Sequence, residues 1–171
     1  MTGLVFVDTN VLLYAVDSRD AVKHRVARDW MDRLWRDQSG RTGVQVLSEF
    51  YVNSTRTLSP PLERAEAWQH VVALGEWQPQ PVDMRVLEMG QELQRRYGLN
   101  WWDSLIVAAA RLQGCAVLLT EDLQHGAVYA GVSALNPFRS RVSEAQAVYA
   151  SRLETQPRRG RGRPRKAAAP P

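Results

Sequence analysis

Four acidic residues stand out because the sequence around them is apolar, although carboxylates are costly to bury. They are Asp8, Glu49, Asp103 and Asp122, out of 18 acidic residues in the chain. Ionised carboxylates that share a half-buried crevice repel one another and lose hydration, so they need compensation. A divalent cation is the simplest compensation, and carboxylate oxygens favour Mg²⁺ or Mn²⁺. Such ions activate water and neutralise phosphate oxygens, so the set predicts phosphodiester hydrolysis.

Asp8 and Asp122 follow two predicted strands. Residues 4–7 form an apolar run typical of a strand buried on both faces, and Asp8 ends it. Residues 116–119 have the same character, and Asp122 comes three residues after them. Ligand sites in open parallel sheets lie outside the carboxyl ends of the strands, so we expect both acids to face one crevice.

Asp103 and Glu49 are predicted to lie at the starts of two helices. Asp103 heads an apolar helix, and its i+3 neighbour Ile106 indicates that the acid faces inward. Glu49 follows the apolar Val46 by three residues. We expect Glu49 to begin a helix just after a short strand at residues 44–46.

Each acid also has a purely structural interpretation. Asp8 and Asp103 suit helix N-caps, because a short carboxylate accepts hydrogen bonds from the free N–H groups of a first turn. Glu49 could be a solvated glutamate, and Asp122 a turn residue. The common position of the four acids, at strand ends and helix starts, favours a shared site.

Strands alternate with helices along the chain, which predicts an α/β fold with a small parallel sheet flanked by helices. Further strands are predicted within residues 127–135 and, as a weak strand or extended connection, within 77–82. Helices are predicted at residues 11–15, 21–38, 47–58, 63–74, 83–97, 103–113 and 140–153. We expect a domain at residues 1–137, a C-terminal helix at 138–154 and a disordered basic tail at 155–171.

Positive charge is concentrated near the C-terminus. The formal net charge is +4, and removing the six basic residues of positions 157–171 leaves −2 for the rest of the chain. Within this tail, residues 161–164 (Arg-Gly-Arg-Pro) resemble an AT-hook, which lays an extended Arg-Gly-Arg segment in the A·T minor groove. The alternative is a generic basic tail that binds any nucleic acid by counterion release.

The N-terminal apolar stretch is interrupted by Asp8, Thr9 and Asn10, and no apolar run is long enough to cross a bilayer. We therefore expect no signal peptide and a cytoplasmic protein. The chain has a single cysteine, Cys115, which excludes a disulfide framework and a thiolate zinc site. A small buried thiol is the expected role of Cys115.

Four motifs around the acids resemble those of PIN-domain nucleases. Residues 6–12 (Phe-Val-Asp-Thr-Asn-Val-Leu) resemble the opening motif, and residues 47–50 (Leu-Ser-Glu-Phe) the second. Residues 103–110 (Asp-Ser-Leu-Ile-Val-Ala-Ala-Ala) resemble the third motif, and residues 119–123 (Leu-Thr-Glu-Asp-Leu) the fourth. Their order and spacing, over roughly residues 4–137, also resemble VapC-type toxins of toxin–antitoxin pairs.

The resemblance implies a PIN-like three-layer α/β/α fold and a Mg²⁺- or Mn²⁺-dependent endoribonuclease, the toxin of a type II toxin–antitoxin pair. It implies an RNA substrate, a cognate antitoxin protein and a homodimer as partners. The catalytic and metal-binding residues would be Asp8, Glu49, Asp103 and Asp122. The residues that orient these acids or bound water would be Thr9 or Asn10, with Ser48 and Thr120. Glu121 should point away from Asp122, because side chains alternate along a strand.

Some other side chains have a chemical and a structural interpretation. Trp101 and Trp102 precede Asp103 and could stack on RNA bases, although we expect at least one of them to pack in the core. The candidates for holding substrate phosphates are Arg95, Arg96 and Arg111, with solvated helix faces as the alternative. No catalytic role is assigned to the histidines, which are His24, His70 and His125.

Two further classes of protein remain open. The first is a nucleic-acid-binding regulatory protein, with a non-catalytic PIN-like domain and DNA contact through residues 158–166. The second is a phosphatase with a nucleophilic aspartate, which usually has another aspartate two residues on, where this chain has Asn10. No glycine-rich phosphate loop follows the first strand, which excludes nucleotide-dependent oxidoreductases and kinases.

Overall fold

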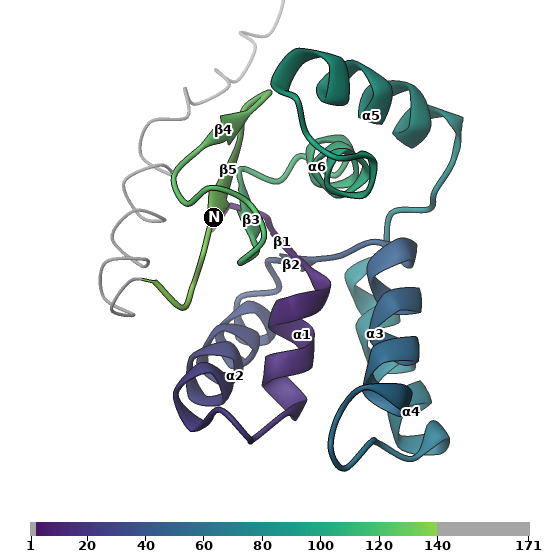
Figure 1. Ribbon diagram of the computed structural model, residues 1–171, viewed down its shortest axis with the longest axis vertical. Helices are drawn as coiled ribbons and strands as arrows, with labels where there is room; N and C mark the ends of the chain where they lie inside the picture. Colours follow the sequence, from purple (N-terminus) through teal and green to yellow (C-terminus); the bar gives the residue numbers. More distant parts are fainter. Residues whose placement is uncertain (1–2, 140–171) are drawn as a thin grey trace, which may run out of the picture.

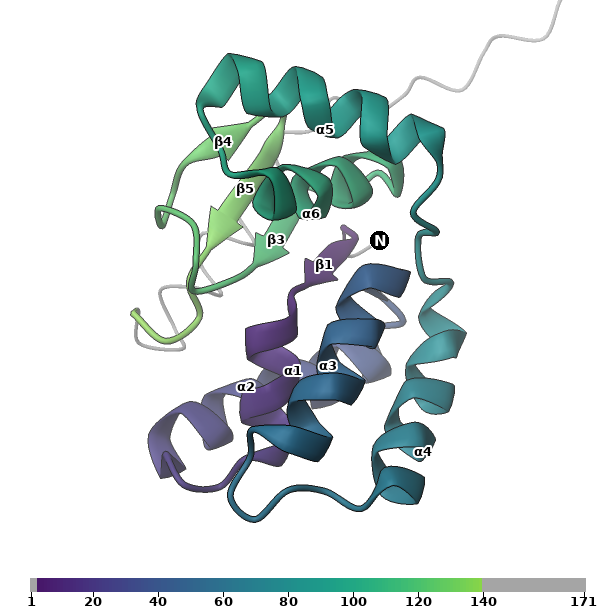
Figure 2. The same cartoon turned by 45° about the vertical axis from the view of Figure 1, so that its right-hand side comes forward.

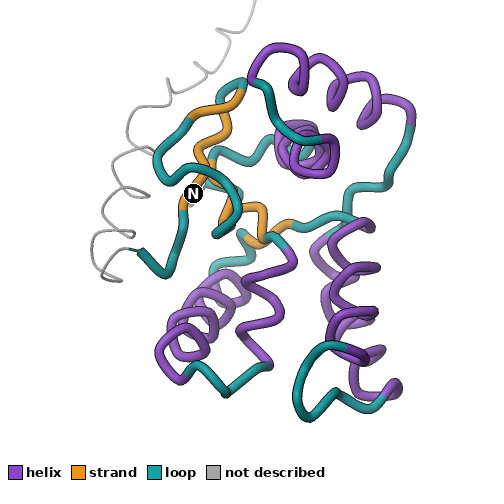
Figure 3. Tube along the Cα trace, viewed as in Figure 1, coloured by secondary structure: helices purple, strands orange, loops and turns teal. Residues whose placement is uncertain are grey.

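A short, fully buried strand near the N-terminus lies inside the sheet, with a parallel strand on each side. The computed structural model describes residues 3–139 (Figure 1). In it β1 (Val5–Val7) lies between β2 (Gly40–Arg41) and β3 (Val117–Leu119), parallel to both. β5 (Val132–Leu135) continues the parallel sheet beside β3, and β4 (Val128–Tyr129) closes that edge antiparallel to β5. The strand order is β2-β1-β3-β5-β4, and Figure 3 shows the strands gathered between the helices.

The helices form two groups around this sheet. The elements are α1 (Thr9–Val16), α2 (Ala21–Arg36), α3 (Val44–Arg56), α4 (Arg64–Leu74), the 3₁₀-helix η1 (Gly75–Trp77), α5 (Met84–Tyr97) and α6 (Trp101–Leu112). α6 packs on β3 and β5, and α5 packs against α6. α1 contacts both α2 and α3, and α4 packs on α3, so α1 to α4 form the second group (Figure 2). The predicted α/β class is confirmed.

Local sequence signals fix several of the helix ends. Asp83 caps α5 by accepting from the Val86 N–H at 3.1 Å, and Gly98 ends that helix in the left-handed conformation, with φ of 67°. Both features agree with the prediction for residues 83–98. α5 also approaches α6 closely at Gly90, where a Cβ atom would lie 2.6 Å from Leu105 Cδ2. A side chain at that position would therefore displace the buried side chain of Leu105.

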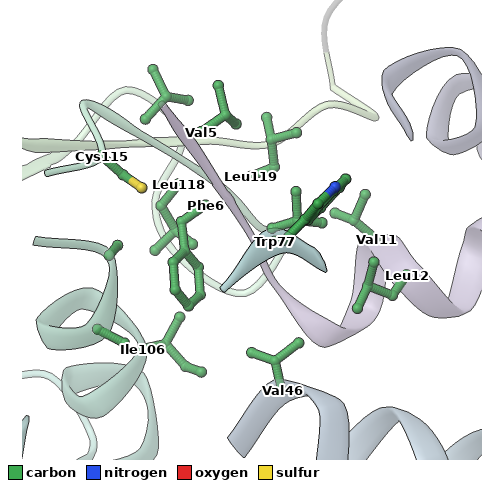
Figure 4. Packing of buried hydrophobic residues seen from close by; sticks show 14 of the residues in the cluster. Val5, Phe6, Val11, Leu12, Val46, Trp77, Ile106, Cys115, Leu118 and Leu119 are labelled. Carbon is green, nitrogen blue, oxygen red and sulfur yellow. The ribbon is translucent and has the colours of Figure 1, made fainter. Parts of the chain in front are cut away.

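The hydrophobic core lies on both faces of the central strands. Phe6 and Leu118 are completely buried on neighbouring strands, and Ile106 and Val46 approach them from α6 and α3 (Figure 4). Cys115 is also buried, and this burial raises the pKa of its thiol to about 12. The thiol is therefore protonated at neutral pH, and the predicted role of Cys115 as a small buried side chain agrees with its position.

The predicted strand at residues 44–46 is wrong. Val44 begins α3 with Gly43 as N-cap, and the strand lies earlier, at Gly40–Arg41. The valines at 44 and 46 are apolar because Val46 packs into the core from a helix, while Val44 is largely exposed. A strand at Gly40 is possible because the missing side chain leaves room for Trp77, whose ring atoms would lie 2.5–2.6 Å from a Cβ there.

Two other expectations are refined. The strand predicted within residues 127–135 is a hairpin, in which Ala130 (φ 49°) and Gly131 (φ 90°) turn β4 back into β5. Residues 77–82 contain the last residue of η1 and an isolated parallel bridge between Gln80 and Gly43. Among residues 3–139, no helix is long and apolar enough to cross a membrane. The helix predicted at 140–153 and the basic tail lie outside the described residues.

Candidate functional site

Asp8 lies where the carboxyl ends of β1 and β3 meet. Its backbone N–H donates to the Leu119 carbonyl at 3.0 Å, and the residue as a whole is only 8% exposed. One carboxylate oxygen, Oδ1, accepts from the Thr9 N–H at 2.7 Å and caps α1. The other, Oδ2, accepts from the Thr120 hydroxyl at 2.7 Å. Asp8 is thus both a helix N-cap and a buried acid at the predicted sheet edge.

Asn10 connects Asp8 to Asp122. The Asn10 Nδ2 atom donates to Asp122 Oδ2 at 2.9 Å and lies 3.4 Å from Asp8 Oδ2. Its Oδ1 atom accepts from the Glu121 N–H at 3.3 Å, which orients the amide. The Asp122 N–H in turn donates to Thr120 Oγ1 at 3.1 Å. The structure therefore brings Asp8 and Asp122 together through one amide and one hydroxyl.

Glu49 reaches the same region from α3. It lies well inside that helix, which starts at Val44, so the expectation that Glu49 begins a helix is wrong. Its Oε2 atom accepts from the Thr9 hydroxyl at 3.0 Å, and its Oε1 atom accepts from Gln45 Nε2 at 3.0 Å. Thr9 therefore links Glu49 to the helix that Asp8 caps.

Asp103 lies in the first turn of α6. Its N-cap is Asn100, which accepts from the Asp103 N–H at 2.9 Å, so the alternative of Asp103 as the cap is wrong. The Asn100 amide also donates to Asp103 Oδ2 in a short hydrogen bond. The positive end of the α6 dipole favours a carboxylate at this position. Within residues 3–139, no hydrogen bond joins Asp103 to the other acids, so its coupling to them is electrostatic.

Burial and mutual repulsion raise the pKa of two of these acids. The pKa of Asp8 is raised to about 6, chiefly by desolvation; the hydrogen bonds from Thr120 and Thr9 lower it, and the charges of Asp122 and Glu49 add to the rise. The pKa of Asp103 is raised by burial and then by Asp122, the Asn100 hydrogen bond opposes this, and Glu49 raises it slightly. Since Asp122 and Glu49 act on both groups, the four acids share one region of negative potential.

The composition of this region fits a hard divalent cation. It offers carboxylate, hydroxyl and amide oxygens, and the partners of the buried Asp8 carboxylate are all uncharged. However, within residues 3–139 no three Asp, Glu, His or Cys side chains converge closely enough to hold a metal ion as they stand. Coulombic coupling acts over longer distances than ligation, so the two observations agree. Direct ligation of one ion by three of these acids would require side-chain rotation.

Lys23 on α2 braces the loop that follows β3. Its Nζ atom lies 2.7 Å from Glu121 Oε2 and 2.8 Å from the Tyr14 hydroxyl. The same ammonium lies 4.3 Å from the centre of the Tyr14 ring and 5.2 Å from that of Phe138. Glu121 is thus paired with Lys23, and because β3 ends at Leu119, the strand alternation used to predict the direction of Glu121 does not extend to it. Sequence reasoning missed Lys23, because nothing marks one lysine on an amphipathic helix.

If this site hydrolyses RNA, as the sequence predicts, Lys23→Met should lower the rate of cleavage about 3- to 10-fold. Loss of the ammonium frees Glu121, whose backbone N–H orients Asn10 between Asp8 and Asp122. The ion pair is about one quarter exposed, so the free energy of unfolding should fall by less than about 1 kcal/mol. Single-turnover cleavage and thermal unfolding measure the two effects. Unchanged cleavage by a stably folded variant would show that the ion pair between Lys23 and Glu121 does not affect the site.

Asp8 should make the metal-free protein less stable as pH rises. Its folded pKa of about 6 exceeds the ordinary value of 3.8, so the folded state binds the proton more tightly. Stability contributed by this group is therefore present below about pH 4 and lost as pH rises to about 6. In EDTA, Asp8→Asn should remove about 2 kcal/mol of this decline. Urea unfolding of both proteins at pH 4.5 and 7.5 measures it, and an equal decline would contradict the assignment.

The remaining candidate side chains separate into buried and exposed. Trp101 packs against the core, as expected for at least one of the pair, whereas Trp102 is 63% exposed beside Asp103. Arg111 donates to the Ala130 carbonyl and so supports the β4–β5 hairpin. Arg95 and Arg96 lie exposed near the end of α5. Trp102 is thus an exposed aromatic side chain in the first turn of α6, the turn that also carries Asp103.

A family model of the PIN domain matches residues 5–130, and the chain therefore belongs to the PIN-domain family. Members of this family are generally nucleases. The matched residues include all four acids. Comparison with curated proteins finds no matching sequence.

Three solved structures illustrate the similarity in fold. FitAcB from Neisseria gonorrhoeae has a TM-score of 0.59 at 16% identity, covering 80% of this chain and 100% of that one. A toxin–antitoxin complex from Klebsiella pneumoniae has a TM-score of 0.58 at 19% identity, covering 78% and 97%. VapC20 from Mycobacterium tuberculosis, a toxin that cleaves the sarcin–ricin loop, has a TM-score of 0.50 at 20% identity, covering 69% and 89%. At these identities the comparison shows the fold.

Proposed function

We propose that this PIN-domain protein is a Mg²⁺- or Mn²⁺-dependent endoribonuclease whose centre comprises Asp8, Glu49, Asp103 and Asp122. The observation that carries the proposal is the buried carboxylate of Asp8, whose pKa is raised to about 6 and whose hydrogen-bond partners are all neutral. Ionising an acid in this state is costly, and a bound cation would offset that cost. PIN domains are generally nucleases, and phosphodiester hydrolysis is the reaction that such a centre supports.

Four carboxylates of this chain would bind the cation, and neighbouring polar side chains restrain those carboxylates. A bound divalent cation supplies an activated water and neutralises charge on the phosphate. Asp8 and Asp122 would hold that cation with Asp103 and Glu49. Thr120 and Asn10 fix the positions of the Asp8 and Asp122 carboxylates through the hydrogen bonds described above. Glu49 is restrained at both oxygens by Thr9 and Gln45, and Asp103 is restrained by Asn100.

An RNA substrate is supported by the exposed indole next to Asp103. Trp102 is 63% exposed at the start of α6, where a flat apolar surface has no structural role. Single-stranded RNA is recognised largely by stacking of its bases on aromatic side chains. Trp102 and Asp103 share the first turn of α6, so a base stacked on Trp102 would hold the strand against the helix that carries this acid. A small phosphoester would gain nothing from this platform.

A role as the toxin of a toxin–antitoxin pair in the cytoplasm is the accompanying proposal. Similar structures include toxin–antitoxin complexes, which supports a cognate antitoxin as partner. The outer surfaces of α3 and α4 carry exposed apolar side chains that suit a protein partner, Val44, Val52, Trp68 and Val72. A homodimer, and contact with DNA through the tail at residues 158–166, also belong to this proposal.

The proposed function is tested by expressing the wild-type chain and the Asp8→Asn variant and sequencing RNA 5′ ends from both cultures. New ends shared across replicates and present only with the wild type are expected. Asn at position 8 keeps the size and the capping oxygen of Asp8, so the fold should survive, which circular dichroism would check. The same new ends in both cultures, from equally abundant folded proteins, would exclude a nuclease centred on Asp8.

A further inference from the structure

A second hollow lies at the edge of the sheet remote from the acids. It has a volume of about 400 Å³ and is lined by Trp35, Gln38, Arg41, Glu76, Trp77 and Gln78. Its wall comes from the end of α2, the short strand β2 and the 3₁₀-helix η1. The volume falls within the range of roughly 300–1,000 Å³ that small-molecule sites occupy. We call this hollow the Trp35 pocket.

The Trp35 pocket is at the amino ends of the strands. Gln38 lies two residues before β2, whereas Asp8 and Thr120 directly follow β1 and β3. Because these strands are parallel, their amino ends lie at the edge opposite to the acids. Gln113, which precedes β3, donates to the Gln78 carbonyl at 2.7 Å and so ties the rim to the same edge. Ligand binding at the Trp35 pocket can therefore be measured separately from the nuclease centre.

Two indole rings give the pocket an aromatic wall. Their centroids are 5.0 Å apart and their planes are tilted by 47°. Trp77 is 3% exposed and fixed against Gly40, whereas Trp35 is 39% exposed. The buried Nε1 atom of Trp77 has no hydrogen-bond partner within residues 3–139. Since Trp35 is the more exposed of the two rings, it is the part of this wall on which a flat ligand can stack.

The pocket is lined by one basic and one acidic side chain, Arg41 and Glu76, and no ion pair joins them within residues 3–139. Within residues 3–139, Arg41 donates only to the Gly40 carbonyl, at 2.7 Å, and Glu76 forms no ion pair. Arg41 therefore retains guanidinium donors for an anion, which Arg commonly provides to phosphate. Glu76 retains a carboxylate that accepts hydrogen bonds. An aromatic wall with one cation and one acceptor suits a nucleobase that carries a phosphate.

The backbone around the pocket is strained at two positions. Gln38 and Gln78, both with φ of 53°, are two of the three non-glycine residues in the left-handed region among residues 3–139. Glutamine gains nothing from this conformation, unlike glycine, and such strain gathers at ligand sites. Here it presents two amide side chains to the rim of one hollow.

We propose that the Trp35 pocket binds a nucleobase with its phosphate, and that it prefers guanine. Trp35 supplies the stacking surface and Arg41 the contact with the phosphate. Guanine presents two adjacent N–H donors on one edge, which match the two oxygens of Glu76, whereas adenine, cytosine and uracil do not. The source of the base is either a free mononucleotide or an unpaired position of an RNA strand.

The test uses the full-length protein in EDTA, where cleavage is suppressed, with calorimetric titration of GMP, AMP, CMP and UMP. GMP should bind most tightly, and Trp35→Ala and Arg41→Gln should each weaken it about tenfold. Glu76→Gln should remove the preference for GMP over AMP. The matched control is Trp68→Ala, since Trp68 is 58% exposed and lies on α4, outside the pocket. Asp8→Asn should bind GMP as the wild type does.

A second arm uses a short RNA with one unpaired G, and the same RNA with A at that position. If RNA is the source, Trp35→Ala should weaken binding of the first RNA and not of the second, while GMP alone binds weakly. If the free nucleotide is the source, Trp35→Ala should weaken the binding of GMP and leave the binding of both RNAs unchanged. Trp35→Phe, which keeps an aromatic ring, separates loss of stacking from loss of folding. The proposal would be overturned if Trp35→Phe, Trp35→Ala and Arg41→Gln all left the affinities for GMP and for both RNAs unchanged.

Discussion

Chelation of divalent ions should reduce RNA cleavage by at least about 10³-fold, and millimolar Mg²⁺ or Mn²⁺ should restore it. The reason is the shared negative potential of the four acids, in which burial and the charges of Asp122 and Glu49 raise the pKa of Asp8. Without a cation nothing in the centre activates water or neutralises the phosphate. The measurement is cleavage of a labelled RNA during a titration with EDTA and then with each metal.

The same cation should stabilise the fold, since it binds the native state alone. Mg²⁺ or Mn²⁺ should raise the melting temperature of the wild-type protein by several degrees at pH 7.5, and much less that of Asp8→Asn. Lys23→Met serves as the control, because it alters the loop beside the centre and leaves all four acids in place. Full cleavage after complete removal of metal, verified by elemental analysis, would reject metal dependence.

Deletion of residues 155–171 should weaken nucleic-acid binding about 100-fold at 0.1 M salt while leaving cleavage of a short RNA intact. The deleted segment carries six basic residues and no acidic residue. Each phosphate that is neutralised adds roughly 0.7 to the salt slope for a single strand, so the slope should fall by as much as about 4. Filter binding between 50 and 300 mM salt measures it.

A charge-preserving variant distinguishes the two interpretations of this tail. Replacing Arg161 and Arg163 by Lys keeps the charge but changes the groups that enter a minor groove. A generic tail should tolerate this change, whereas an AT-hook should lose its preference for A·T duplexes over G·C duplexes. An unchanged salt slope after deletion would show that the tail makes no phosphate contacts.

The parts of the fold that were predictable are those with strong local signals. The buried strands at β1 and β3 are short apolar runs, and the acids or threonine that follow them mark their ends. α5 has a cap at each end, with Asp83 and Gly98 in the expected conformations. Because parallel strands end at one edge, the meeting of Asp8 with Asp122 also followed from the sequence.

The parts that were missed depend on contacts between distant segments. β2 is two residues long, and it exists because Gly40 admits the ring of Trp77 from 37 positions later. Valines at 44 and 46 suggested a strand, but burial of Val46 from one side of a helix satisfies the same pattern. The ion pair between Lys23 and Glu121 spans 98 residues, and no periodicity encodes it.

The burial of Cys115 makes this chain convenient for labelling experiments. Its thiol has a pKa near 12 and is shielded from solvent, and no other cysteine is present in the sequence. Maleimide reagents attack thiolates, so the wild-type protein should react very slowly while it is folded. A cysteine introduced at the exposed Gln91 would then carry a single dye without prior removal of Cys115. Binding of RNA or of a partner protein could be followed by the fluorescence of that one position.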